Sequence, residues 1–259
     1  MESIDTNQPQ RRFTGTQRLY GAPAFAHLQA AHIVVIGIGG VGSWAAECLA
    51  RTGVGQLTLI DLDVVGESNI NRQIHAADAT LGANKVDVMA QRIASYAPHC
   101  AVNCVDEWIT PANVAALVPA SADCVIDCID QVRSKAALAA LCVVRGQALV
   151  ICGAAGGKTD LSQLAVADLA LVTHDPLLAT LRSDLRKNHG FAGGAVSTKK
   201  QGKPKKLGLR CVYIAQPVAR PSDDAAASGG LNCAGYGSVA AVTASMGLRA
   251  AHEAVGVLV

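Results

Sequence analysis

The chain has 259 residues and a net charge of +2, and its composition is 51% hydrophobic and 16% charged. This composition is typical of a globular protein, and the length allows one large domain or two small ones, each with a hydrophobic core. The nine cysteines lie mostly inside apolar runs with no secretory signal before them, which favours reduced thiols in a cytoplasmic protein over a disulfide framework.

The cysteine spacing also bears on metal binding. No two cysteines form a C-x-x-C pair; three residues separate Cys100 from Cys104, and three separate Cys124 from Cys128. The second pair alternates along a predicted strand, which does not suit a four-thiolate zinc site. We therefore expect core thiols and no structural zinc.

The first 155 residues show an alternation of strand and helix patterns, after a segment over residues 1–10 that we expect to be a disordered leader. We expect strands at residues 32–36, 56–60, 102–105, 124–129 and 148–152, and helices near residues 43–52, 82–97, 111–118 and 133–145. Repeated strand–helix units with right-handed crossovers form a parallel sheet covered on both faces. Residues 30–155 are therefore predicted to form a Rossmann-like, doubly wound α/β core with a mostly parallel sheet.

The pattern changes after the glycine-rich residues 153–157. We expect a short strand near residues 163–166, a helix at 176–187, a glycine and lysine loop to residue 206, a strand at 208–214 and a final helix at 237–254. These elements are predicted to extend the same sheet. Residues 156–259 then form a substrate-side extension, and residues 11–259 a single domain.

One uncharged stretch, residues 228–248, is long enough to raise the question of a membrane span, since about 20 apolar residues cross a bilayer. Its first half, SGGLNCAGYGS, is small and polar, and Arg249, His252 and Glu253 follow it directly. We expect a packed helix of small residues and no membrane contact.

Basic residues are concentrated in the second half of the chain. Between Arg182 and Arg210 there are nine basic residues and a single acidic one, Asp184. The lysines of this segment are Lys187, Lys199, Lys200, Lys203, Lys205 and Lys206. A mobile solvated loop is one interpretation of the run at 199–206, and an RNA contact is the other. The local charge excess favours a polyanion partner.

The stretch VVIGIGGVGS, residues 34–43, follows the first predicted strand. Gly37, Gly39 and Gly42 fit the pattern G-x-G-x-x-G, with Gly40 inside it, and the following helix N-terminus offers free N–H groups to phosphates. Asp61 ends the next strand, where a carboxylate can accept from ribose hydroxyls. This motif alone does not separate a dehydrogenase from an ATP-using enzyme.

The residues after Asp61 favour ATP. Asn69, Arg72 and Lys85 follow the ribose-binding strand, and such groups suit triphosphate charge and a pyrophosphate leaving group. The run VIDCID puts Asp127 and Asp130 beyond a second strand end, where one carboxylate can hold magnesium.

Each of these residues also has a structural alternative. Arg72 can pair with Asp61 or Asp63, and Lys85 can be a solvated helix residue. Asp127 can serve as a strand-end partner for the backbone or for Ser134 rather than for a metal.

Together, the motifs GIGGVGS, DLDVVGESNINRQ, GANKV and DCID resemble the ubiquitin-activating and ThiF/MoeB superfamily of adenylating enzymes. The resemblance implies that ATP converts a carboxylate into an acyl adenylate. It also implies that Gly39 and Gly40 line the nucleotide and that Asp61 holds the ribose. Further candidates for the phosphates are Ser68, Asn69, Arg72 and Lys85, with Asp130 as the magnesium ligand.

Within this superfamily the chain lacks the two C-x-x-C zinc pairs typical of the ThiF and MoeB branch. The segments RFTGTQRLYG, NINRQIHA, VRSKAAL, AAGGKTD and NCAGYGS resemble the tRNA threonylcarbamoyladenosine dehydratases instead. This resemblance implies ATP-dependent ring closure on modified tRNA through adenylation of the threonyl carboxylate. It also implies a homodimer, in which Arg12 or Arg18 contacts ATP across the interface.

Cys233 lies in a polar glycine loop, which makes it a candidate to line the active site. Relatives among the ubiquitin-activating enzymes use a cysteine for acyl transfer, and a sulfur-relay partner is another possible role for this thiol. In the dehydratase reaction the nucleophile is already on the substrate, and no base flanks the thiol.

Three rival functions remain open at the level of sequence. The same core can adenylate the C-terminal glycine of a ubiquitin-like sulfur-carrier protein. A nicotinamide-binding redox or sensor protein would bind NAD rather than magnesium and ATP. A catalytically silent scaffold would bind tRNA without hydrolysing ATP.

Overall fold

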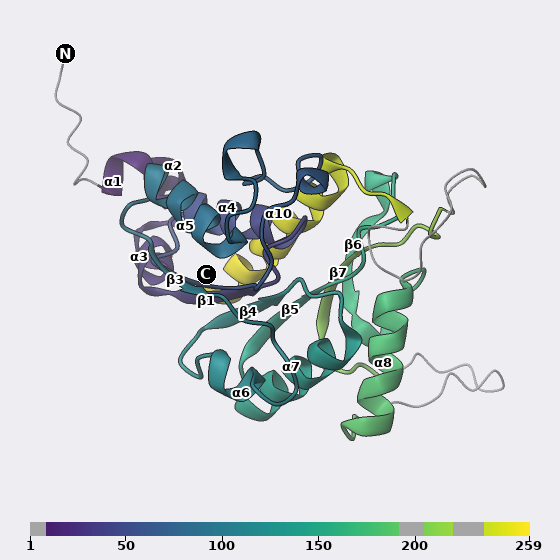
Figure 1. Ribbon diagram of the computed structural model, residues 1–259. Coiled ribbons are helices and arrows are strands. Elements are labelled where there is room, and N and C mark those ends of the chain that lie inside the picture. Colours follow the sequence, from purple (N-terminus) through teal and green to yellow (C-terminus); the bar gives the residue numbers. More distant parts are fainter. Residues whose placement is uncertain (1–8, 192–204, 220–235) are drawn as a thin grey trace, which may run out of the picture.

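The computed structural model describes residues 9–191, 205–219 and 236–259, which form a seven-stranded sheet with helices on both faces (Figure 1). The strands are β1 (His32–Ile36), β2 (Gln56–Ile60), β3 (Ala101–Val105), β4 (Cys124–Asp127), β5 (Ala148–Cys152), β6 (Leu164–Asp168) and β7 (Arg210–Ile214). Their order is β3-β2-β1-β4-β5-β7-β6, and neighbours are parallel except β6 with β7. The predicted α/β fold with a mostly parallel sheet is confirmed.

Helices form a layer on each face of this sheet. They are α1 (Pro9–Arg12), α2 (Thr14–Tyr20), α3 (Ala22–Ala30), α4 (Gly42–Thr52), α5 (Lys85–Tyr96), α6 (Val114–Leu117), α7 (Val132–Arg145), α8 (Pro176–Asn188) and α10 (Ala240–Leu258). In Figure 1, α3, α4, α5 and α10 lie on one face and α6, α7 and α8 on the other. Helix α1 takes in the last two residues of the expected leader, and residues 1–8 lie outside the described chain.

The central strand β1 explains why both faces are covered. All five of its residues are buried, as expected for a strand in the middle of a parallel sheet. Ile33 and Val35 pack into the core under α4 and α10, whereas Val34 and Ile36 pack into the core under α6 and α7. The apolar run therefore supplies two cores at once through the two-residue period of the strand.

Two predicted elements are shorter than expected. The helix expected over residues 111–118 is reduced to α6, because Asn113 Oδ1 accepts hydrogen bonds from the backbone N–H and the hydroxyl of Thr110 and closes a turn. The strand expected over residues 124–129 ends at Asp127, whose carboxylate accepts from the backbone N–H of Ile129. In both places a side chain replaces the regular backbone pairing.

Helix α10 lies directly against α4 (Figure 1). A Cβ atom on Gly247 would lie 2.4 Å from the carbonyl oxygen of Val41 and 2.8 Å from Cβ of Trp44, so only glycine allows this close approach. None of the helices within the described ranges combines the length and apolar character that crossing a membrane requires. The first part of the uncharged stretch at 228–248 lies outside those ranges.

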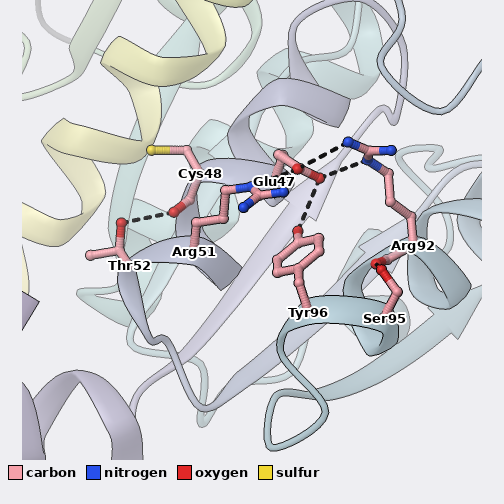
Figure 2. Close-up of polar contacts among 7 residues, drawn as sticks. All are labelled: Glu47, Cys48, Arg51, Thr52, Arg92, Ser95 and Tyr96. Carbon is pink, nitrogen blue, oxygen red and sulfur yellow. Dashed lines mark hydrogen bonds and ion pairs between the residues drawn. The ribbon is translucent and has the colours of Figure 1, made fainter. Parts of the chain in front are cut away.

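A buried carboxylate joins α4 to α5 (Figure 2). Glu47 accepts from Arg51 Nε at 2.7 Å, from Arg92 Nε at 2.9 Å and from the Tyr96 hydroxyl at 2.9 Å. Burial would raise the pKa of Glu47, but the hydrogen bonds from Arg92, Arg51 and Tyr96 outweigh it and lower that pKa. The cluster thereby fixes α4, and with it the glycine loop that precedes α4.

Candidate functional site

A cleft of about 1110 Å³ lies at the carboxyl edge of the sheet. Residues that follow β1, β2, β4 and β5 all line it, as expected for a ligand site in a doubly wound fold. Pockets for a single small ligand typically measure about 300–1,000 Å³. The cleft is therefore large enough for a nucleotide and part of a second substrate.

Most of the predicted nucleotide-binding residues meet in this cleft. Its lining includes Gly37, Gly39, Gly40, Asp61, Asn69, Arg72, Lys85 and Asp130. Two predicted residues, Gly42 and Ser68, are absent from the lining.

The glycines of the loop have different tasks. Gly37 has a φ of 84°, and a Cβ atom there would lie 3.0 Å from the carbonyl group of Cys128. A Cβ atom on Gly42 would lie only 1.9 Å from the carbonyl oxygen of Gly37. Gly42 does not line the cleft, and this glycine lets α4 start close against the end of β1; its contact with the cofactor stays a prediction.

Asp61 connects the end of β2 to the glycine loop. Its Oδ2 accepts from the backbone N–H of Ile38 at 2.6 Å, and its Oδ1 accepts from that of Asp63 at 2.8 Å. Burial raises the pKa of Asp61, although both hydrogen bonds and the charge of Lys85 oppose this. Asp61 lines the cleft as a ribose ligand should, and it also holds the loop in place.

Two cations, Arg72 and Lys85, line the cleft. Lys85 is 5% exposed, and its ammonium lies 2.7 Å from Asp63 Oδ2, so the solvated alternative for Lys85 is wrong. Arg72 Nη1 donates to the carbonyl oxygen of Ser68 at 2.6 Å and to Asn71 Oδ1 at 2.9 Å, not to Asp61 or Asp63. Ser68 thus positions Arg72 through its backbone and does not itself line the cleft.

Asp127, the last residue of β4, and Asp130, three residues later, have separate environments. Asp127 is fully buried and lies 2.9 Å from the ammonium of Lys135, which also donates to the carbonyl oxygen of Ile129. Ser134 is not its partner, because that hydroxyl donates to the carbonyl oxygen of Ile109. Asp130 is exposed on the cleft wall. A single carboxylate facing a phosphate site fits Mg²⁺, which usually takes one or two carboxylates and several phosphate oxygens.

A second part of the cleft lining was not predicted from the sequence. It consists of Gly153–Gly156, the turn at 173–175, Arg182 from α8, and the pair Pro217 and Val218. The dipeptide Asp-Pro at 175–176 signals a helix start, but nothing in the sequence connects that start to the cleft. Within the described ranges, no three His, Cys, Asp or Glu side chains gather to hold a metal ion.

Several further predicted residues lie away from the cleft or outside the described chain. Cys233, Lys199, Lys200 and Lys203 fall in ranges that the structure does not describe, and Lys205 and Lys206 are exposed. Arg12 donates to the carbonyl oxygen of Tyr96, and Arg18 is exposed on α2; neither lines the cleft of its own chain.

Comparison with known proteins agrees with this arrangement. The ThiF family model matches residues 15–259. The tRNA threonylcarbamoyladenosine dehydratases of Haemophilus influenzae and Escherichia coli are 41% and 45% identical, in each case over 98% of this chain and over 95% and 96% of the relative.

Among solved structures, the E. coli enzyme TcdA in complex with ATP matches with a TM-score of 0.85 and 43% identity, covering 96% of this chain and 94% of that one. The chain therefore belongs to the ThiF family and, within it, to the tRNA threonylcarbamoyladenosine dehydratases.

Proposed function

We propose that this protein uses ATP to close the threonylcarbamoyl side chain of modified adenosine in tRNA into a ring, with net loss of one water. The observation that carries the proposal is the convergence of the glycine loop, Asp61, Arg72, Lys85 and Asp130 on one cleft. The names of the relatives, and the ATP bound to TcdA, point to the same reaction.

The chemistry requires two displacements. The threonyl carboxylate attacks the α-phosphorus of ATP, and pyrophosphate leaves. A nitrogen or oxygen of the carbamoyl group then attacks the acyl carbon, AMP leaves, and the attacking group loses its proton. Because the nucleophile is part of the substrate, the protein contributes positioning and charge stabilisation rather than a covalent residue.

The roles of the cleft residues follow from their charges. Lys85 and Arg72 neutralise charge on the phosphates, and their contacts to Asp63, Ser68 and Asn71 hold them in place before ATP binds. Asp61 would accept from the ribose hydroxyls. Asp130 would hold magnesium, which supplies further neutralisation of the phosphate charge.

We propose a cytoplasmic homodimer in which residues 11–259 act as one adenylating unit, with a nucleotide core at 30–155 and a substrate-side extension at 156–259. The exposed side chain of Arg18 is available to reach the nucleotide site of a second copy. We also propose that Cys233 contacts a sulfur-relay partner and that Asp130 holds magnesium.

The direct test uses purified protein, magnesium, ATP and tRNA that carries threonylcarbamoyladenosine. After digestion to nucleosides, mass spectrometry should show loss of one water that requires ATP. If the nucleoside is unchanged although ATP is bound, the substrate is a different carboxylate, such as the C-terminal glycine of a carrier protein.

Two substitutions test the assigned phosphate contacts. Arg72→Ala and Lys85→Ala should each lower kcat by about 10²-fold or more, because removal of one charge-stabilising group typically costs that much. Arg249→Ala, on the exposed side of α10, is the matched control and should keep full turnover. Circular dichroism should show all three variants folded, and near-normal turnover of either cleft variant would refute the phosphate assignment.

A further inference from the structure

One buried lysine is not accounted for by ATP binding. Lys158 is 2% exposed and follows the glycine-rich loop at 153–157. Its ammonium donates to the carbonyl oxygen of His174 at 2.8 Å and, through a short hydrogen bond, to that of Gln216. Burial lowers the pKa of Lys158, and the nearby Asp175 carboxylate opposes this.

Lys158 and its two partners, His174 and Gln216, belong to or adjoin three segments that line the cleft. Gly153–Gly156, the turn at 173–175 and the pair Pro217 and Val218 all line it. Further hydrogen bonds join these segments: Asp175 Oδ2 accepts from the backbone N–H of Ala154, and Gln216 Oε1 accepts from those of Thr159 and Asp160. Lys158 lies behind this part of the lining, because its own side chain does not line the cleft.

The turn held by Lys158 has an unusual backbone. His174 has a φ of 57°, the one positive φ among the non-glycine residues that the structure describes. This left-handed conformation is uncommon outside glycine and persists where surrounding contacts enforce it. The ammonium of Lys158 binds the carbonyl oxygen of His174, and the next residue, Asp175, caps α8 by accepting from the backbone N–H of Leu178 at 2.9 Å.

The residues assigned to ATP come from segments of the lining other than those joined by Lys158. The assigned nucleotide residues come from the ends of β1 and β2, from the start of α5 and from the turn after β4. The lining near the turn at 173–175 also includes Arg182 of α8, the helix that carries Arg186 and Lys187. The positive charge of α8 beside the cleft would attract the phosphates of an RNA whose carboxylate enters there.

We propose that Lys158 is a positioning residue for the RNA side of the cleft, which holds the loop after β5 and the turn at 173–175 in the shape that receives the threonylcarbamoyl nucleoside. This inference rests on the proposed function. The ammonium acts through backbone carbonyls and contacts neither ATP nor the reacting atoms.

The test separates the two sides of the cleft. Lys158→Met keeps the length of the side chain and removes the ammonium, and kcat/KM for modified tRNA should fall about 100-fold, as expected when reacting groups are misplaced by about 1 Å. The Kd of magnesium and ATP, measured by calorimetry, should stay within about twofold of wild type, because the nucleotide residues keep their contacts.

Leu185→Ala is the matched control for loss of stability. Leu185 is a fully buried residue near the end of α8 and does not line the cleft, so its truncation lowers the melting temperature without removing a cleft contact. This control should keep kcat/KM within about threefold of wild type, since truncation on the core side of α8 leaves the hydrogen bonds of Lys158, His174 and Asp175 in place. If Lys158→Met keeps kcat/KM as well as Leu185→Ala does, or loses ATP binding in parallel, the inference is wrong.

A second variant covers the case in which Lys158→Met does not fold. Lys158→Ala leaves space for a small cation, so ethylammonium should restore part of its turnover while leaving Arg72→Ala inactive. Absence of any recovery would overturn the requirement for a cation behind this part of the lining. If the wild-type protein itself does not dehydrate the modified nucleoside, the proposed function fails instead.

Discussion

Among single residues, Lys135 shows most directly how a buried charge supports the site. Burial lowers the pKa of Lys135, but the charge and hydrogen bond of Asp127 raise it above the ordinary value. The ammonium also donates to the carbonyl oxygens of Asp127 and Ile129, so the turn that carries Asp130 wraps around it. The position of Asp130 on the cleft wall therefore depends on a residue that never touches the cleft.

We predict that Lys135→Met lowers the free energy of unfolding by about 3–5 kcal/mol, because it leaves the Asp127 carboxylate buried without a counter-ion. Urea denaturation measures this loss. The double variant Asp127→Leu with Lys135→Met removes both charges and should recover most of it. A loss below about 1 kcal/mol in the single variant would show that the pair carries no buried charge.

A second residue-scale prediction concerns pH. His75 is 3% exposed, and burial together with the charges of Lys85 and Arg92 lowers its pKa from 6.5 to about 4. Below pH 6.5 the unfolded chain binds a proton on His75 that the folded chain does not bind. The free energy of unfolding therefore falls as the pH drops toward 4. Between pH 7 and pH 5 this one group should cost about 2 kcal/mol.

Urea denaturation of wild type and His75→Leu at the two pH values checks this. The wild type should lose about 2 kcal/mol more than His75→Leu on acidification. The control His252→Leu, at an exposed position on α10, should retain the wild-type pH dependence. Equal slopes for wild type and His75→Leu would mean that His75 is not the titrating group.

At the scale of elements, the junction of β1 and α4 forms the glycine loop of the proposed nucleotide site. The loop between them passes beneath the end of β4, where a Cβ atom on Gly37 would meet the Cys128 carbonyl. Thr243 of α10 lies over the other side, since a Cβ atom on Gly40 would be 2.9 Å from its Cγ2. The loop is therefore enclosed between two elements that lie far from it in sequence.

We predict that Gly42→Ala weakens ATP binding at least tenfold, because the new Cβ would lie 1.9 Å from the Gly37 carbonyl oxygen and the backbone must move. Gly256→Ala, in α10 with nothing within 4 Å of the added Cβ, is the matched control. It should leave ATP binding unchanged and gain up to about 1 kcal/mol in stability. Calorimetry with ATP distinguishes the two, and unchanged affinity in Gly42→Ala would refute the packing role.

At the scale of the whole molecule, several basic residues gather around α8 beside the cleft. Around α8, Arg182 donates to the carbonyl oxygens of Leu169 and Val172, while Lys187, Lys205 and Lys206 are exposed. Arg210 is instead paired with Glu253 at 3.2 Å and is less available to RNA. Exposed lysines therefore lie around α8, where the nucleic acid is proposed to enter.

Replacing Lys199, Lys200, Lys203, Lys205 and Lys206 with glutamine should weaken tRNA binding and flatten its salt dependence. Each lysine that meets a phosphate contributes about 0.7–0.9 to the slope of log affinity against log salt concentration. Titrations at several salt concentrations measure this slope. The control pair Arg11→Gln and Arg249→Gln, exposed at other places on the surface, should leave it unchanged. An unchanged slope in the lysine variant would make the run a solvated loop.

Much of the architecture could be predicted from the chain because its signals are local. The apolar runs at β1, β2 and β5 match the observed strands residue for residue, since buried parallel strands need continuous apolar stretches. Gly37, Gly39, Gly40, Asp61, Asn69, Arg72, Lys85 and Asp130 also follow from motifs, and all of them line the cleft. Carboxyl ends of parallel strands meet at one edge, so strand assignment alone brings these residues together.

The rest was decided by tertiary structure. Local pattern does not reveal that Lys85 is buried against Asp63, that Gly42 packs on Gly37, or that Asp127 pairs with Lys135 rather than with a metal. Nor does it reveal the part of the lining behind which Lys158 binds the carbonyls of His174 and Gln216, 16 and 58 residues away in sequence. The sequence by itself determined the fold class, the family motifs and the nucleotide side, whereas burial and long-range hydrogen bonds arise only when separate segments pack together.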